Sequence, residues 1–213
     1  MKITEEMLSA LRKEIVPYLA PKRYLHTLAV EEEAAALGEI YLPEEVNSLR
    51  AAALLHDITK RADTETQLQY CRDFGISVSE EDLHSPKVFH AKTAAGLVKK
   101  SFPAYADEQI LNGIRWHTTG HCGMTVFEAI VYLADYIEAT RTFPDCVALR
   151  QYFYDGLAEA KTMAEKEAVF TRTMVLSFDM TIRNLIEENA PIDSDTIAAR
   201  NAYVYRTKQP ADA

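Results

Sequence analysis

An imidazole and a carboxylate stand side by side at His56-Asp57, directly after the apolar run from Ala51 to Leu55. A carboxylate has two oxygens and can bind one cation on each, whereas a histidine ring offers one nitrogen to one cation. Asp57 is therefore a candidate bridge between two metal ions. The pair alone is weak evidence, because a helix end satisfied by hydrogen bonds can contain the same two residues.

Other histidines occur in similar apolar surroundings. Of the six in the chain, four occupy predicted helical segments or helix ends next to apolar residues: His26, His56, His90 and His117. A single histidine of this kind is more often a hydrogen-bonded core residue than a metal ligand. Four of them, together with Asp57 and with Asp135 in an apolar segment, favour a shared metal centre.

The charge of this set supports the same interpretation. Arg141 is the only Lys or Arg close to Asp135 in the sequence, and a buried carboxylate without a counter-charge is costly. Four neutral imidazoles and two carboxylates carry about −2, and two divalent cations would bring the site to about +2, which suits an anionic substrate. The nitrogen and oxygen donors suit iron, manganese, cobalt or zinc.

Composition excludes several classes of protein. The 213 residues carry a net charge of −9, which argues against a nucleic acid polymer or an anionic membrane as partner. The three cysteines, Cys71, Cys122 and Cys146, have no metal-site or disulfide spacing, which favours the reducing cytoplasm. The N-terminus does not resemble a signal peptide, and no apolar run approaches the roughly 18 residues of a membrane span.

Helical periodicity dominates the chain and predicts an all-α fold. Capping residues and prolines predict helices over about 4–19, 21–41, 43–57, 63–75, 86–101, 106–116, 126–140, 145–159, 166–188 and 193–205, with a short turn at 79–82. In the helix 126–140, Ile130, Leu133, Ala134 and Ile137 are expected to face the core. We expect one domain over 1–213, with a metal-binding core at about 20–145 and C-terminal packing helices at about 146–205.

Several local strings carry a family resemblance: Arg23 to Thr27, His56 to Lys60, His90-Ala91, Arg115 to Gly120, Gly123 to Thr125, and Ala134 to Glu138 followed by Arg141 and Phe143-Pro144. Together they resemble the HD-domain metal phosphohydrolases, and among these the YqeK-type symmetrical bis(5'-nucleosyl)-tetraphosphatases. The resemblance spans nearly the whole chain. It implies an HD-domain helical bundle and a metal-dependent hydrolase that splits diadenosine tetraphosphate into two ADP.

The resemblance also implies two ligand sets. One metal ion would be held by His26, His56, Asp57 and Asp135, and a second by Asp57, His90 and His117. The cofactors are then two divalent transition metal ions, iron first, with manganese or cobalt as alternatives. A cation lowers the pKa of bound water from about 15.7 to near 7, so a hydroxide held between the two metals could attack a phosphate at neutral pH.

Further residues are expected to act on the substrate. Lys60 and Arg141 are candidates for a phosphate clamp, and Lys60 also for a catalytic role beside Asp57. Thr118, Thr119 and Gly120 could offer backbone N–H groups to phosphate, although a glycine-containing loop is more often only a turn. His121 stands where many relatives have a basic residue, so it is a candidate phosphate contact or proton donor, or else an exposed side chain.

Several alternatives stay open at this stage. Another HD-type phosphohydrolase, acting on a mono- or triphosphate, a cyclic nucleotide or an alarmone, would use the same ligands. So would a di-iron oxygenase, although Lys60 and Arg141 favour phosphate. A nucleotide-binding module with a structural metal is a fourth hypothesis. The residues that bind the base are not assigned, and the sequence leaves the oligomeric state open, a homodimer included.

Overall fold

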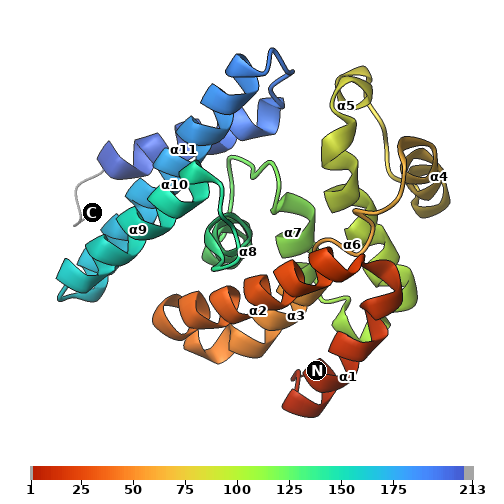
Figure 1. The fold of residues 1–213 in the computed structure, drawn as a ribbon, viewed down its shortest axis with the longest axis horizontal. Helices are drawn as coiled ribbons and strands as arrows, with labels where there is room; N and C mark the ends of the chain where they lie inside the picture. The colour runs from red at the N-terminus through yellow and green to blue at the C-terminus, as the bar shows by residue number, and fades with distance from the viewer. Residues whose placement is uncertain (1, 209–213) are drawn as a thin grey trace.

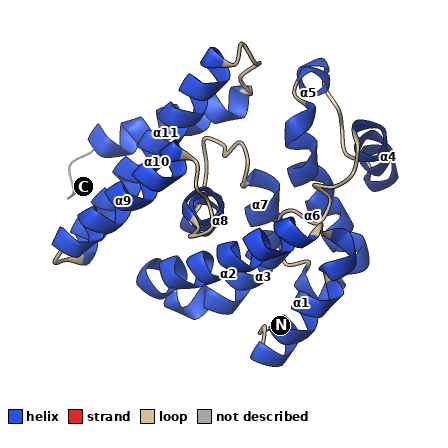
Figure 2. Ribbon diagram, viewed as in Figure 1, coloured by secondary structure: helices blue, strands red, loops and turns tan. Residues whose placement is uncertain are grey.

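The computed structural model describes residues 2–208, apart from the side chain of residue 81. Within this range every regular element is helical and no strand occurs (Figure 2). The all-α prediction is therefore confirmed. The α-helices are α1 (Glu5–Glu14), α2 (Pro21–Tyr41), α3 (Val46–Leu55), α4 (Thr64–Phe74), α5 (Glu80–His84), α6 (Phe89–Ser101), α7 (Glu108–Trp116), α8 (Val126–Ile137), α9 (Pro144–Glu159), α10 (Met163–Glu187) and α11 (Ser194–Lys208).

Short turns that contain a proline change three of the predicted helix boundaries. Short 3-10 turns form at η1 (Val16–Tyr18), η2 (Pro43–Glu45), η3 (Pro86–Val88) and η4 (Pro103–Tyr105), each with a proline in its first two positions. Proline lacks the N–H of a continuing helix and its ring clashes with the preceding turn. The predicted helices over 4–19, 43–57 and 86–101 are consequently shorter, and their α-helical parts are α1, α3 and α6.

Side-chain caps fix the start of several helices as expected. Thr4 accepts a hydrogen bond from the backbone N–H of Met7, and Asp63 accepts one from that of Thr66. Thr125 and Glu128 form the predicted capping box at the start of α8. These caps satisfy backbone donors that have no partner inside the helix.

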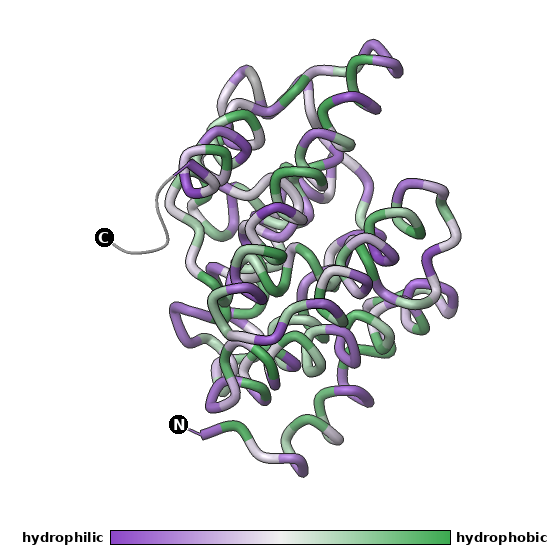
Figure 3. Tube along the Cα trace, turned by 90° about the vertical axis from the view of Figure 1, so that its left-hand side faces the viewer, coloured by the Kyte–Doolittle hydropathy of each residue, from purple (hydrophilic) through white to green (hydrophobic). Residues whose placement is uncertain are grey.

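The helices pack around α8, which has neighbours on both sides. In Figure 1, α9, α10 and α11 lie on one side of α8, whereas α4, α5 and α6 lie beyond α7 on the other. Helices α2 and α3 pack against each other and both contact α8, while α1 packs on α3 and α4 on α6. Hydrophobic and hydrophilic stretches alternate along the helices in Figure 3, as expected when one face of each helix is buried.

Helix α8 has a fully buried face and ends close to the candidate ligand Asp135. Ile130, Leu133, Ala134 and Ile137 have no exposed surface, as predicted from their spacing. The helix ends at Ile137, earlier than the predicted residue 140, because Glu138 adopts an extended conformation (φ −54°, ψ 152°). That turn of the backbone leaves Asp135 in the last turn of α8.

No described helix is both long and apolar enough to cross a membrane. Among the described residues all three cysteines are unpaired, in agreement with the absence of a disulfide pattern. The single domain over 1–213 stays a prediction, and its last five residues lie outside the described range.

Candidate metal centre

Five helices bring the predicted ligands together. His26 lies on α2, Asp135 lies near the end of α8, and His90 is the second residue of α6. His56 and His117 directly follow the last residues of α3 and α7. A helix end is a fixed point in the bundle, so these side chains start from rigid positions.

The two oxygens of Asp57 face different groups of imidazoles. Asp57 Oδ2 lies 3.4 Å from His56 Nε2 and 3.9 Å from His26 Nε2. Asp57 Oδ1 lies 3.2 Å from His90 Nε2 and 3.6 Å from His117 Nε2. We call the first group, with Asp135, the Oδ2 half, and His90 with His117 the Oδ1 half. The aspartate thus stands between the two halves.

Asp135 completes the Oδ2 half. Its Oδ1 atom lies 3.0 Å from His26 Nε2 and 3.7 Å from His56 Nε2. Three overlapping groups of potential ligands have donor atoms within 4.8 Å of one another: His26, His56 and Asp57; His56, His117 and Asp135; Asp57, His90 and His117. These clusters have the donor types and spacing of divalent metal sites.

Unsatisfied polar atoms provide a test of whether a metal fits. His26 Nε2, His56 Nε2 and Asp57 Oδ1 are buried and make no hydrogen bond with any described residue. An unpaired buried polar atom is costly, and most such atoms in proteins find a partner. All three belong to the cluster and are atom types that bind transition metals, so the residues present fit divalent metal ions.

The other ring nitrogen of each histidine is held by a hydrogen bond. The Nδ1 atoms of His56, His90 and His117 lie 2.6 to 2.7 Å from backbone carbonyl oxygens three residues earlier, which belong to Ala53, Lys87 and Ile114. His26 differs, because its Nδ1 lies 3.1 Å from Glu138 Oε1. In each case the second nitrogen fixes the ring so that Nε2 points into the cluster.

Burial and neighbouring charges shift the pKa values of these groups in opposite directions. Burial lowers the pKa of His117 to about 4 and also lowers that of His90. For His26 burial acts in the same sense, but the neighbouring carboxylates of Asp135 and Glu138 outweigh it and raise the pKa to about 9. Burial alone would raise the pKa of Asp57, yet the surrounding imidazoles hold it well below its usual range.

Three cationic side chains surround the cluster. Arg23 Nη1 donates to Asp57 Oδ2 at 3.0 Å, and Arg141 Nη2 donates to Asp135 Oδ1 at 2.6 Å. Lys60 Nζ lies 2.9 Å from His90 Nε2 and 4.0 Å from Asp57 Oδ1, and burial lowers its pKa. The sequence-based argument that the carboxylates lack protein counter-charges is therefore wrong, and the case for metal ions rests on the donor geometry instead.

The loop after α7 contributes less than expected. Thr118 Oγ1 reaches His90 Nε2 at 3.2 Å, whereas the hydroxyl of Thr119 donates to the carbonyl oxygen of Gly120. The N–H of Gly120 donates to the carbonyl oxygen of Trp116 at 2.9 Å. The expectation that Gly120 offers a free N–H to phosphate is not met in this conformation. Phosphate contacts by Thr118 and Thr119 stay predictions.

His121 is held within the same loop. Its Nε2 lies 3.2 Å from Glu128 Oε2, its Nδ1 accepts the N–H of Gly123 at 3.2 Å, and its ring lies against Trp116. Both ring nitrogens therefore have partners outside the cluster. A catalytic role for His121 stays a prediction that requires these contacts to break.

Arg23 and Glu138 are functional candidates that the sequence analysis did not single out. Each stands three residues from a predicted ligand, Arg23 before His26 and Glu138 after Asp135. For Arg23 this spacing places the side chain near His26 on the same face of α2, and it is the signal that could have identified it. Glu138 lies just past the end of α8, so helical spacing gives no such signal for it.

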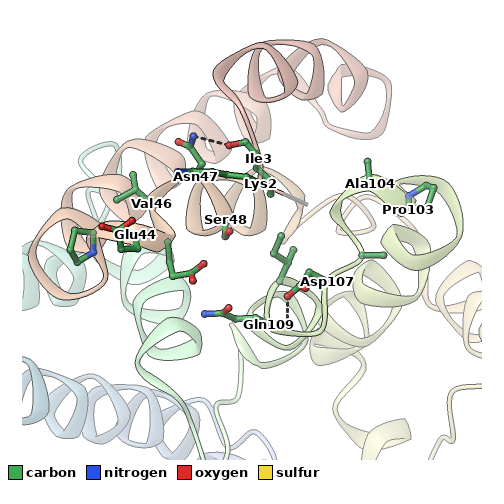
Figure 4. A pocket seen from close by; sticks show the side chains of 14 residues that line it. Lys2, Ile3, Glu44, Val46, Asn47, Ser48, Pro103, Ala104, Asp107 and Gln109 are labelled. Carbon is green, nitrogen blue, oxygen red and sulfur yellow. Dashed lines mark hydrogen bonds between the residues drawn. The ribbon is translucent and has the colours of Figure 1, made fainter.

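The largest pocket described, about 800 Å³, lies elsewhere (Figure 4). Its lining includes Val46 at the start of α3 and Asp107 just before α7. The cluster lies beyond the opposite ends of these two helices. The pocket therefore contains none of the predicted ligands.

Comparison with known proteins agrees with this geometry. A relative from Halalkalibacterium halodurans, named symmetrical bis(5'-nucleosyl)-tetraphosphatase, is 31% identical over 91% of this chain and 95% of its own length. A relative of the same name from Bacillus subtilis is 30% identical over 92% of this chain and 95% of its own length.

A solved structure from Clostridium acetobutylicum has a similar fold, with a TM-score of 0.80 and 30% identity. It covers 96% of this chain and 100% of its own, and it is described as a predicted HD superfamily hydrolase involved in NAD metabolism. The family model of the HD domain matches residues 23–140. The chain therefore belongs to the HD domain family, among relatives that are named symmetrical bis(5'-nucleosyl)-tetraphosphatases.

Proposed function

We propose that this protein hydrolyses dinucleoside tetraphosphates symmetrically, so that diadenosine tetraphosphate yields two ADP. The names of full-length relatives at about 30% identity support this reaction. The observation that carries it is the position of Asp57, whose two oxygens face separate groups of imidazoles. Such a carboxylate can serve two cations at once, an arrangement common in enzymes that displace phosphate groups.

Two divalent transition metal ions are the proposed cofactors. His26, His56, Asp57 and Asp135 would hold one, and Asp57, His90 and His117 the other. When bound, such ions neutralise phosphate charge and lower the pKa of a coordinated water. Iron is our first choice, with manganese or cobalt as alternatives, because all three accept nitrogen and carboxylate donors.

The chain's own cations would bind the polyphosphate. Arg23, Lys60 and Arg141 balance the carboxylates Asp57, Asp135 and Glu138, so metal ions would leave a surplus of positive charge for an anionic substrate. Lys60 is 37% exposed at its side chain and can therefore reach both the cluster and solvent. We assign Lys60 to binding of the phosphates of the nucleoside diphosphate that leaves, through the positive charge of its ammonium group.

The full chain loaded with Mn²⁺ or Fe²⁺ tests this function. ADP should be the sole nucleotide released from diadenosine tetraphosphate, and a chelator should abolish its release. In ¹⁸O-labelled water, one of the two ADP molecules from each substrate should carry the label. Release of AMP together with ATP would reject symmetrical cleavage.

The relative described as involved in NAD metabolism motivates a second candidate. NAD is also a dinucleotide joined by a phosphoanhydride, so the same centre could act on it. A panel containing NAD, nucleoside mono- and triphosphates and cyclic nucleotides decides between the substrates. Oxygen uptake dependent on a small polyol would instead indicate an oxygenase. A cytoplasmic location and a homodimer stay predictions.

A further inference from the structure

Three pockets border the candidate metal centre, and each contains a different residue in contact with it. One of about 450 Å³ includes Arg141, one of about 310 Å³ includes Lys60 and His90, and one of about 280 Å³ includes Thr118. We call the first the Phe143 pocket. It lies between the connection from α8 to α9 and the last two turns of α10.

The Phe143 pocket contains an exposed aromatic ring. The Phe143 residue is 67% exposed and lines the pocket together with Tyr136 and Pro144. A large exposed aromatic side chain beside the candidate metal centre is a candidate binding surface for a nucleotide. Any of the nucleobases can stack on such a ring, because each base has a flat aromatic face. The pocket therefore offers a flat apolar surface for a base.

Polar groups lie at the edge of the same pocket. Asn184 Nδ2 donates to Asp145 Oδ2 at 2.8 Å, and both residues line the pocket. The amide oxygen of Asn184 and the second carboxylate oxygen of Asp145 are acceptors of the kind that meet the exocyclic amine of a base. Stacking and edge recognition are thus available side by side.

Arg141 joins this pocket to the centre, because it lines the pocket and donates to Asp135. A base in the Phe143 pocket would therefore have its phosphates directed at the cluster. The other pockets suit a base less well. The Lys60 pocket also contains Lys87, which favours phosphate, and the described lining of the Thr118 pocket includes no Phe, Tyr or Trp.

We propose that the Phe143 pocket binds one nucleoside of the substrate, with the base stacked on Phe143 and its edge against Asn184 and Asp145. This assignment rests on the proposed function, since it takes the substrate to be a nucleotide. Phe143 acts on affinity for the nucleoside and takes no part in the hydrolytic step.

The test compares three variants of the full, Mn²⁺-loaded protein: Phe143→Ala, Phe143→Tyr and, as a control, Tyr205→Ala, which removes a 65% exposed aromatic side chain from α11. Calorimetry measures binding of ADP and of inorganic pyrophosphate. Phe143 is mostly exposed and makes no side-chain cap bond, so its removal should leave the fold intact, as a thermal melt would verify.

Loss of the stacking of one base on an aromatic ring corresponds to a binding affinity that is weaker by about 5- to 150-fold. We expect this for ADP with Phe143→Ala, and the KM for diadenosine tetraphosphate should rise in the same sense. Pyrophosphate affinity should stay unchanged, Phe143→Tyr should restore ADP binding, and Tyr205→Ala should match the wild type. Unchanged ADP affinity in Phe143→Ala would overturn the proposed nucleoside site, and so would an equal loss of affinity for pyrophosphate.

The two proposals fail in different ways. If the wild type releases ADP from diadenosine tetraphosphate while Phe143→Ala binds ADP normally, the pocket is wrong and the proposed function stands. If the wild type cleaves no dinucleotide yet binds ADP through Phe143, the proposed function is wrong and the pocket stands.

Discussion

The two halves of the candidate centre share Asp57 but differ in their surroundings. The Oδ2 half contains a second carboxylate, Asp135, and lies beside Arg23 and Arg141. The Oδ1 half contains only imidazoles, with Lys60 alongside. The pKa values follow this difference, since carboxylates raise that of His26 to about 9 whereas burial lowers that of His117 to about 4.

This difference indicates a division of labour within the proposed function. The Oδ2 half offers four protein donors when Asp57 is included, and the Oδ1 half offers three. A site with fewer protein ligands keeps more positions open for substrate, as catalytic sites do. We therefore expect the Oδ2 half to retain its ion more firmly and the Oδ1 half to receive a phosphate oxygen.

Removing the shared carboxylate should have the largest effect. In Asp57→Asn we expect both metal ions to be lost and ADP release to fall by about 1000-fold or more, because both halves lose an anionic ligand. Elemental analysis and product assays measure the two effects. Asp73→Asn, an exposed change on α4, serves as control. Two ions per chain in Asp57→Asn would contradict the shared role of Asp57.

Removing one imidazole from each half should separate the halves. The His90→Ala variant should keep one metal ion, in the Oδ2 half. The His26→Ala variant should bind the metal ion of the Oδ2 half more weakly, whereas His90 and His117 should still bind the ion of the Oδ1 half. Anomalous scattering from Mn²⁺ or Fe²⁺ crystals locates each ion. Turnover should fall in both variants by about 100-fold or more, since the reaction needs both halves. Loss of the same ion in both variants would rule out two separate positions.

Glu138→Gln should affect only the Oδ2 half. The neutral amide keeps the shape of the side chain but removes the negative charge beside His26 Nδ1. Loss of such an outer partner typically weakens metal binding by about 10- to 100-fold. Metal titration measures the affinity, and kcat at saturating metal should change little. Glu39→Gln, an exposed change on the same helix as His26, is the matched control. Equal weakening of both ions would show that Glu138 acts on the whole bundle.

Lys60→Met should have the smallest effect, a rise of about fivefold in the KM for diadenosine tetraphosphate. Lys60 is partly exposed, so water and salt screen its attraction for phosphate. The rise should shrink as salt is added, which steady-state kinetics at two ionic strengths would measure. Lys99→Met, on the last turn of α6, should behave as the wild type. A KM that is unchanged at low salt would exclude Lys60 from the phosphate clamp.

The sequence predicted the all-α fold, because the helical period is clear along most of the chain. The apolar surroundings of the histidines favoured a shared metal centre, and the family resemblance implied which residues form its two ligand sets. The sequence did not predict the short 3-10 turns, since a proline is compatible both with the first turn of an α-helix and with a turn that precedes one. It named His121 as a candidate phosphate contact or proton donor, or else an exposed side chain, but did not predict that this ring lies against the carboxylate of Glu128.

The partners of the ligands were harder to predict than the ligands. His26 and Glu138 are 112 residues apart, and Arg23 and Asp57 are 34 apart. Such contacts depend on how helices pack, which one sequence does not reveal. The base pocket is a similar case, because Asp145 and Asn184 meet only when α9 packs against α10.

Three of the four imidazole rings are oriented by hydrogen bonds with the main-chain oxygens of residues 53, 87 and 114. Every amino acid supplies such an oxygen, so mutation of those positions cannot delete the anchor as long as the helical path persists. The orientation of these three rings therefore depends on the path of the backbone. This allows the side chains around the centre to differ widely between distant homologues. Only His26 depends on the chemical identity of its anchor, and there the tolerance to replacement should be lowest.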